Sequence, residues 1–335
     1  MKVNKGEKMC LKTFIILFII LCSVNCFGGL PTAKLTVRVV DTKGRPIVGA
    51  YSFANFYRNA KSNIVRGETD KNGIFSATGK TIGVCGITVR KEGYYTSGGA
   101  SCEGLKRGGK IFFNRWEPWD RIDTVVLKDI RNPIQMYAKG TDHIDIPILE
   151  QPVGYDLERG DWVTPYGKGV TNDFLFYFKL SDINAKPYHD NWQISYSLTF
   201  PNEKDGIQEY YPDDSNRRSG YIWPYKAPET GYQSRIEGFS LKKNGRFKKT
   251  FDKNKNYIFR IRTIVDKEGK IINARYGKIK GDFRIGLGED SFGTIEFTYY
   301  FNPTGNKNLE YDTKNPLFTF PRNKSGTMGY RVSSP

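Results

Sequence analysis

The sequence predicts an all-β protein built of two antiparallel β-sandwiches, of which the second is the larger. Several segments alternate apolar and polar residues with the two-residue period of a strand that is buried on one face. Short stretches rich in Asp, Asn, Gly and Pro separate these segments, as turns do. No segment longer than about ten residues combines helical periodicity with capping residues. A jelly roll is one candidate arrangement for the second sandwich.

The N-terminus resembles a secretory signal. Four lysines precede an apolar run, Phe14–Cys22, which is shorter than the roughly 20 residues of a transmembrane helix. We therefore predict a signal peptide over residues 1–28, cleaved between Ser23 and Gly29. An uncleaved anchor remains an alternative, as does lipidation of Cys26, although the residues before Cys26 match a lipobox poorly. Either way we expect an exported protein: periplasmic, associated with an outer membrane, or extracellular.

The first domain is predicted over residues 31–130. Leu35, Val37 and Val39 share one face of a strand, and Asp41–Gly44 and Thr69–Gly73 supply tight turns. The motifs VxVxDxxGxPIxGA and GxTDxxGxF, within Lys34–Lys128, resemble those of the carboxypeptidase regulatory-like domain. That resemblance implies a small transthyretin-like or immunoglobulin-like sandwich that serves as an accessory module. It implies no peptidase activity, because the separate catalytic domain with its HxxE zinc motif is absent from this sequence.

Two cysteines remain after the predicted signal region, Cys85 and Cys102. In an oxidising compartment such a pair favours a structural disulfide. A reactive thiol pair is the alternative, but the spacing is not that of a CxxC motif. The glycine-rich stretch around Cys102, residues 97–110, lacks the GxxxxGK[ST] order of a phosphate-binding loop, so we expect a loop between strands.

A linker is predicted over residues 131–152, where three prolines interrupt regular structure. The second sandwich then covers residues 153–321, and residues 322–335 form a polar tail that we expect to be frayed. The segments with the clearest strand patterns are Asp173–Leu180, Gln193–Phe200, Gly293–Phe301 and a hairpin formed by Tyr257–Asp266 and Ile271–Lys280.

Catalytic and metal-binding residue types are scarce. The only histidines, His143 and His189, begin no zinc motif, and no GxSxG sequence is present. We therefore predict no catalytic residues, no bound metal and no cofactor. A glycosidase is the remaining enzymatic alternative because it needs only two carboxylates; its candidate acids are Glu203, Asp205, Glu209, Glu229 and Glu237.

Two loops of the second domain are dense in aromatic residues, and one run is strongly basic. Exposed rings stack on sugars, although core packing is the competing explanation for each of them. The candidate ligand-binding residues are Trp162, Tyr166, Trp223, Tyr225 and Tyr232, and we predict that the loops carrying the two tryptophans meet on one surface. The candidate polyanion patch is Lys242, Lys243, Arg246, Lys248 and Lys249; a solvated charged hairpin explains the same residues.

The net charge of +17, from 52 basic and 35 acidic residues, favours a polyanionic partner. Export argues against nucleic acid and leaves a cell-surface glycan or another anionic envelope polymer. The membrane would be contacted only through an N-terminal lipid or an uncleaved signal. The sequence thus predicts a non-enzymatic bacterial envelope protein with a structural, adhesive or binding role. The alternative is a carbohydrate-binding or glycoside-hydrolysing protein that uses the aromatic loops.

Overall fold

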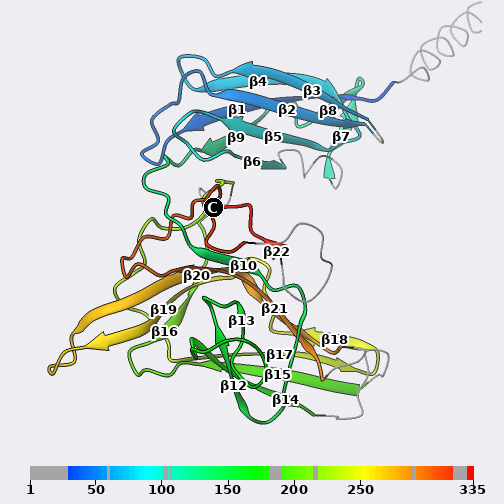
Figure 1. Cartoon of the computed structure of the whole chain (residues 1–335). Helices are drawn as coiled ribbons and strands as arrows, with labels where there is room; N and C mark the ends of the chain where they lie inside the picture. The colour runs from blue at the N-terminus through cyan, green and yellow to red at the C-terminus, as the bar shows by residue number, and fades with distance from the viewer. Residues whose placement is uncertain are drawn as a thin grey trace, which may run out of the picture. The chain divides into compact units, whose positions relative to one another are not determined.

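The computed structural model describes residues 29–58, 61–100, 105, 108–181, 191–213, 218–288, 292–319 and 330–335. These residues form two compact units (Figure 1). Unit 1 contains the chain up to Asp129 together with Arg218–Gly220, and unit 2 contains Ile130–Arg217 and Tyr221–Pro335. Within the described residues, no helix has the length and apolar character that crossing a bilayer requires.

Unit 1 is a sandwich of two sheets (Figure 1). The five-stranded sheet contains β1 (Thr32–Val40), β4 (Ile74–Lys80), β7 (Lys110–Phe112), β8 (Arg115–Glu117) and β9 (Arg121–Val126). The four-stranded sheet contains β2 (Tyr51–Arg58), β3 (Lys61–Glu68), β5 (Cys85–Arg90) and β6 (Ser97–Ala100). Strand β1 pairs antiparallel with β4 and parallel with β9.

The predicted alternation in β1 sets the core of unit 1. Leu35, Val37 and Val39 are fully buried in one cluster with residues of both sheets.

 The first turn has Gly44 at φ +78° and the second has Gly73 at φ +72°, and a Cβ on Gly73 would lie 2.5 Å from the Val39 carbonyl oxygen. Glycine is therefore required at this second turn, because it alone combines a positive φ with such a close approach of the backbone.

Cys85 is buried in the core of unit 1, at the start of β5. It takes part in a disulfide bond. The predicted partner, Cys102, lies outside the described residues, so the pairing of Cys85 with Cys102 stays a prediction.

Unit 2 is a larger sandwich of two antiparallel sheets. The seven-stranded sheet contains β10 (Tyr137–Gly140), β11 (Ile144–Asp145), β16 (Gly206–Tyr210), β19 (Asn256–Val265), β20 (Ile271–Gly286), β21 (Thr294–Asn302) and β22 (Tyr330–Arg331). The six-stranded sheet contains β12 (Pro152–Asp156), β13 (Asp161–Trp162), β14 (Phe174–Leu180), β15 (Asn191–Thr199), β17 (Arg235–Lys243) and β18 (Arg246–Lys249).

The main core of unit 2 is rich in aromatic residues from both sheets. In β14, Phe174, Phe176 and Phe178 are buried, whereas Tyr177 and Lys179 are exposed. The strand is therefore buried on one face only. It lies in the interior of its sheet, between β12 and β15.

Two sequence-based boundaries are wrong. The expected linker, residues 131–152, contributes β10 and β11 to the seven-stranded sheet of unit 2. The expected frayed tail ends in β22, which pairs with β10, and Val332 is buried beside Met136 and Tyr300. Both errors have the same cause: the strands are only two to four residues long, so they show too little alternation to be recognised locally.

The outer face of the seven-stranded sheet carries a second, smaller hydrophobic cluster. Tyr299 and Phe301 of β21 enter the main core, while Tyr300 between them points to the other face and joins the smaller cluster. The C-terminal residues therefore cover part of this outer face. Beside that cover, the pairing of β20 with β21 shifts register between Lys280 and Arg284, and Gly281 lies in this bulge with φ +82°.

Candidate ligand-binding pocket

A pocket of about 660 Å³ opens in unit 2 where the β20 bulge meets the C-terminal segment. Strands β20 and β21 supply Lys280, Arg284, Glu296 and Thr298. These side chains reach the outer face of the sheet, because the residues that alternate with them, such as Phe283 and Phe297, belong to the main core. The remaining walls are residues 211–212, 251–256 and 330–334. We call this site the β20–β21 pocket.

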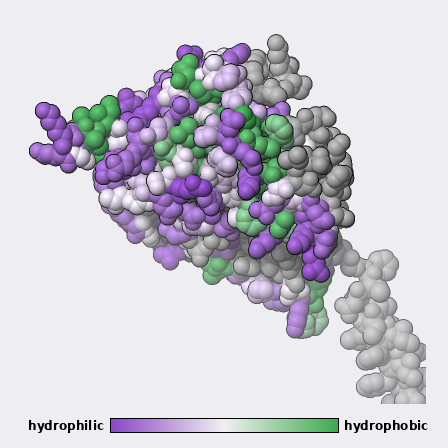
Figure 2. All heavy atoms as spheres, turned by 90° about the horizontal axis from the view of Figure 1, so that it is seen from below, coloured by the Kyte–Doolittle hydropathy of each residue, from purple (hydrophilic) through white to green (hydrophobic). Residues whose placement is uncertain are grey.

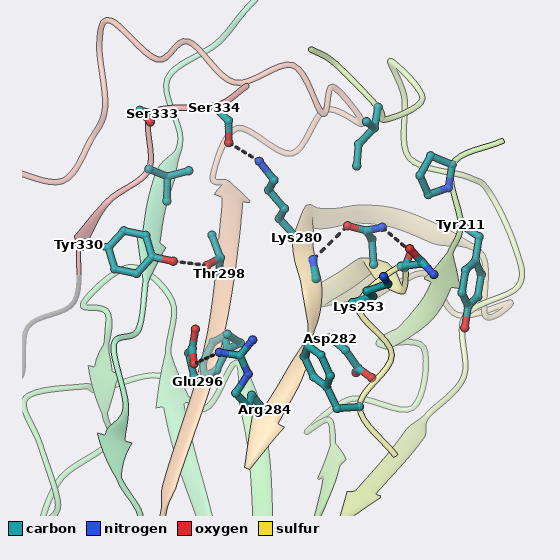
Figure 3. A pocket seen from close by; sticks show the side chains of 18 of the residues that line it. Tyr211, Lys253, Lys280, Asp282, Arg284, Glu296, Thr298, Tyr330, Ser333 and Ser334 are labelled. Carbon is teal, nitrogen blue, oxygen red and sulfur yellow. Dashed lines mark hydrogen bonds and ion pairs between the residues drawn. The ribbon is translucent and has the colours of Figure 1, made fainter. Parts of the chain in front are cut away.

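Two tyrosines flank the β20–β21 pocket on opposite sides (Figure 3). Tyr330 is 48% exposed, and its hydroxyl lies 3.1 Å from Thr298 Oγ1. Tyr211 is 49% exposed, on the segment that follows β16. Both tyrosines are thus accessible to a ligand, and the lining between them combines polar side chains with apolar surface from residues such as Ile222 and Phe251.

Lys280 is the central cation of the β20–β21 pocket. Its Nζ donates a hydrogen bond of 2.8 Å to Ser334 Oγ (Figure 3). The side chain stays accessible to solvent, but the surrounding protein removes part of its hydration, and this desolvation lowers the pKa of Lys280. No carboxylate of the described residues forms an ion pair with it. A bound anion would restore the favourable surroundings of the charged form.

The β20–β21 pocket has five other charged residues, three cations and two carboxylates. Arg284 forms an ion pair of 2.9 Å with Glu296, and its guanidinium lies 4.9 Å from the Phe251 ring centroid. Lys253 and Arg331 have no ion-pair partner among the described residues that line the pocket. With Lys280, the lining carries four cations and two carboxylates, the second being Asp282, so the pocket is suited to a ligand with negative charge.

The Asp282 carboxylate stabilises the β20 bulge through three hydrogen bonds. Its two carboxylate oxygens accept hydrogen bonds from the Tyr257 hydroxyl at 2.5 Å, the Phe283 amide at 2.9 Å and the Asp252 amide at 2.9 Å. These bonds join β19, β20 and the loop that precedes β19. Asp282 therefore has a structural role, and we assign it no proton transfer to a ligand.

Of the predicted ligand-binding residues Trp223, Tyr225 and Tyr232, Trp223 has no exposed face. Trp223 is fully buried, stacks on Tyr210 with ring centroids 5.5 Å apart, and lies beside the buried Lys278. The Lys278 Nζ is 5.1 Å from the Trp223 ring, 5.0 Å from Tyr221 and 4.6 Å from Tyr300, and it donates to the Leu309 carbonyl at 2.7 Å.

The other two predicted rings of that loop are covered by arginines. Arg131 lies 3.6 Å from the Tyr225 ring centroid, and Arg260 lies 4.5 Å from that of Tyr232. Tyr232 also donates to the Pro228 carbonyl at 2.9 Å. Both rings are half-buried, and a cation–π contact within unit 2 occupies one face of each.

Trp162 and Tyr166 line a second pocket, of about 640 Å³. Trp162 is buried against Phe176 and Phe178, and its indole donates to the Asp145 carbonyl at 3.0 Å. Tyr166 is 40% exposed and keeps an accessible face. The expected meeting of the Trp162 and Trp223 loops is not observed, because Trp162 packs in the main core and Trp223 beside Lys278, on the opposite face of the seven-stranded sheet.

The predicted basic patch lies on the β17–β18 hairpin, and the strand geometry divides it. Lys243 pairs with Arg246, and Leu241 with Lys248, so these cations share one face of the hairpin. Lys242 and Lys249 lie on the other face, where Lys242 is 5.6 Å from the Phe247 ring and Lys249 is 4.9 Å from the Phe251 ring. The run is therefore two smaller basic surfaces.

Four of the five candidate glycosidase acids are engaged by hydrogen bonds or ion pairs within unit 2. Asp205 is buried and accepts the Thr263 and Arg262 amides at 2.9 and 3.1 Å. Glu209 pairs with Lys255, Glu237 with Arg235, and Glu229 with Lys307. None of these acids, nor Glu203, lines the pockets described above.

Metal ligands are not clustered in the described part of the chain, where no group of three or more His, Cys, Asp or Glu could hold an ion. His143 lies on the surface with its Nδ1 3.4 Å from Glu296. His189 lies outside the described residues.

Comparisons with known proteins identify no family. No family model and no curated protein matches the sequence. Among solved structures, 3-chlorocatechol 1,2-dioxygenase from Rhodococcus opacus 1CP is 11% identical with a TM-score of 0.26, over 31% of this chain and 62% of the enzyme. The chain therefore spans less than two thirds of that enzyme's length.

Two further solved structures match over more of this chain. The shaft pilin SpaA of Lactobacillus rhamnosus GG is 9% identical with a TM-score of 0.21, over 68% of this chain and 86% of the pilin. A DUF3823 family protein from Parabacteroides merdae ATCC 43184 is 10% identical with a TM-score of 0.20, over 84% and 100%. These scores are too low to support an argument about activity, substrate or partner.

Proposed function

We propose that the protein is a non-enzymatic, exported envelope protein that binds an acidic glycan in the β20–β21 pocket. The observation that carries this proposal is Lys280, an accessible and partly desolvated cation that lies between two exposed tyrosines. Tyrosine faces stack on sugar rings, and the cation supplies a charge-assisted hydrogen bond to a carboxylate or sulfate.

The surroundings of Lys280 support a hydroxylated ligand. Thr298, Ser333, Ser334, Asn254 and Asn256 also line the pocket, so donors and acceptors are available on several sides. The surface of the face in Figure 2 is mostly hydrophilic, with hydrophobic residues in small groups. The polar side chains that line the pocket suit a hydroxylated ligand better than a large apolar one.

The first unit supports the proposal as a spacer. We propose that it is a carboxypeptidase regulatory-like domain, as its two turn motifs suggest. The antiparallel pairing of β1 with β4 and the parallel pairing of β1 with β9 support a compact sandwich of that kind. Such a module would hold the binding unit away from the point of attachment.

The test is a glycan array probed with the purified protein and two variants. We expect retention by acidic glycans, which weakens with added salt as charge attraction is screened. Lys280→Met should lower the affinity about tenfold, the effect of losing about 1.4 kcal/mol of one charged contact. Lys270→Met is the matched control, because Lys270 is exposed in the β19–β20 turn and lines neither pocket described in unit 2.

The two variants remove the same charge, so a general electrostatic attraction would be weakened equally in both. Equal losses, or retention of neutral glycans alone, would reject the proposal that the β20–β21 pocket is the site.

A further inference from the structure

The β7–β8 hairpin of unit 1 carries an exposed apolar tip. Its strands pair as Ile111 with Trp116 and Phe112 with Arg115, and Phe113 and Asn114 form the two-residue turn. Phe112 is 62% exposed and Phe113 is 80% exposed. The two rings contact each other edge to face, with centroids 4.4 Å apart, so the tip is a compact aromatic surface in water.

The backbone holds Phe113 at an unfavourable angle. Phe113 has φ +44° and Asn114 has φ +61°, as the two central residues of a type I′ turn require. Asn tolerates this region, but a bulky residue is strained there. Burial of the Phe113 side chain within unit 1 does not offset that strain, because Phe113 is more exposed than Phe112.

The same tip lies where the chain enters unit 1. The Thr32 amide donates to the Asn114 carbonyl at 2.9 Å, and Thr32 pairs with Arg115. In Figure 1, the start of β1 and the hairpin strands β7 and β8 lie at one end of unit 1. Cys26 is six residues before Thr32, and six residues of extended chain span about 20 Å.

The exposed charges of the hairpin are cations, whereas Glu117, opposite Lys110, is half-buried and accepts the Trp119 amide. Lys110 and Arg115 are exposed on the two strands of the hairpin, and the Arg115 guanidinium lies 4.9 Å from the Trp119 ring. Aromatic rings with flanking cations are favoured at the boundary between lipid headgroups and acyl chains.

We propose that Phe112 and Phe113 insert into the headgroup region of a lipid bilayer, at the end of unit 1 where β1 begins. An N-terminal lipid on Cys26 or an uncleaved signal would hold the chain at that bilayer, and the hairpin tip would orient unit 1 upon it. This inference concerns unit 1 and does not depend on ligand binding in unit 2.

The test places a fluorescent reporter at the tip of the full chain. The protein is bound to vesicles of phosphatidylcholine and phosphatidylglycerol, and Phe113→Trp and Phe112→Trp are measured separately, so that one remains if the other fails to fold. The added tryptophan emission, relative to the unsubstituted protein, should shift to shorter wavelength when the protein binds the vesicles. Brominated acyl chains should quench it.

Phe247→Trp is the matched control. Phe247 is 68% exposed and also lies on a hairpin rich in lysines, so it reports any general attraction of exposed aromatic and basic residues to the vesicles. Stronger quenching at residues 112 and 113 than at residue 247 supports the inference. Equal quenching at all three positions, or no quenching at the tip, would overturn it.

Discussion

At the scale of single residues, the side chains around Lys278 explain why Trp223 is not available for binding. A fully buried ammonium group is unfavourable unless other groups replace its hydration. The Lys278 Nζ lies within 5.1 Å of the ring centroids of Tyr221, Trp223 and Tyr300. It donates a hydrogen bond to the Leu309 carbonyl. The aromatic residues of this loop therefore stabilise a buried cation.

We expect Trp223→Ala to lower the free energy of unfolding by about 3–5 kcal/mol, because it opens a cavity and removes one ring beside Lys278. Tyr166→Ala, at an exposed ring, should change it by only about 0.5 kcal/mol. Denaturant unfolding of both variants compares the two. A loss for Trp223→Ala no larger than that for Tyr166→Ala would contradict the packing described here.

Asp156 is a second residue whose environment predicts a measurable effect. Burial alone would raise its pKa, but backbone amides of Val170, Arg159, Thr171 and Glu158 donate to its carboxylate at 2.9 to 3.0 Å and hold the pKa below the ordinary value. These hydrogen bonds hold residues 158–159 and 170–171, the two ends of the loop that carries Tyr166.

Because the folded-state pKa of Asp156 is below the unfolded value, its stabilisation is present above a pH of about 3.9 and is lost as the pH falls through the folded-state pKa. Asp156→Asn should cost about 1–3 kcal/mol near neutral pH. The difference in melting temperature between this variant and the parent should shrink below about pH 4. A difference that does not change with pH would exclude the charged carboxylate as its cause.

At the scale of elements, the bulge in β20 shapes the β20–β21 pocket. Gly281 has φ +82°, and a Cβ there would meet nothing within 4 Å. Gly281→Ala should therefore cost only the backbone strain, about 1–2 kcal/mol, and Gly281→Asn should cost less because Asn tolerates a positive φ. Thermal unfolding should rank the three proteins as Gly, Asn, Ala in decreasing stability. Equal stability of the Ala and Gly proteins would show that the bulge does not constrain this residue.

The strands with sustained alternation could be predicted from the sequence. Asp173–Leu180, Gln193–Phe200 and Gly293–Phe301 correspond to β14, β15 and β21 within one or two residues at most ends. The candidate site could not be predicted, because Lys280 and Tyr330 are 50 residues apart in the sequence and meet only through sheet pairing. Tyr330 lies in the segment that was expected to be frayed, and its two-residue strand gives no local signal.

At the scale of the whole molecule, each unit has its own hydrophobic core and its own exposed feature. Unit 1 has the aromatic hairpin tip beside the start of β1, and unit 2 has the polar β20–β21 pocket. We propose that unit 1 contacts a bilayer and that unit 2 binds an acidic glycan. Aromatic content alone suggested binding loops in unit 2, but packing in the core and cation–π contacts account for Trp162, Trp223, Tyr225 and Tyr232.

The most direct measurement is calorimetric titration with an acidic oligosaccharide and with the same oligosaccharide after reduction of its carboxyl groups. The parent protein should bind the acidic form about tenfold more tightly, as one charged contact provides. In Lys280→Met this preference should disappear, while Lys270→Met should keep it. Equal affinity of the parent for both forms, or a preference that survives in Lys280→Met, would contradict the account of the β20–β21 pocket.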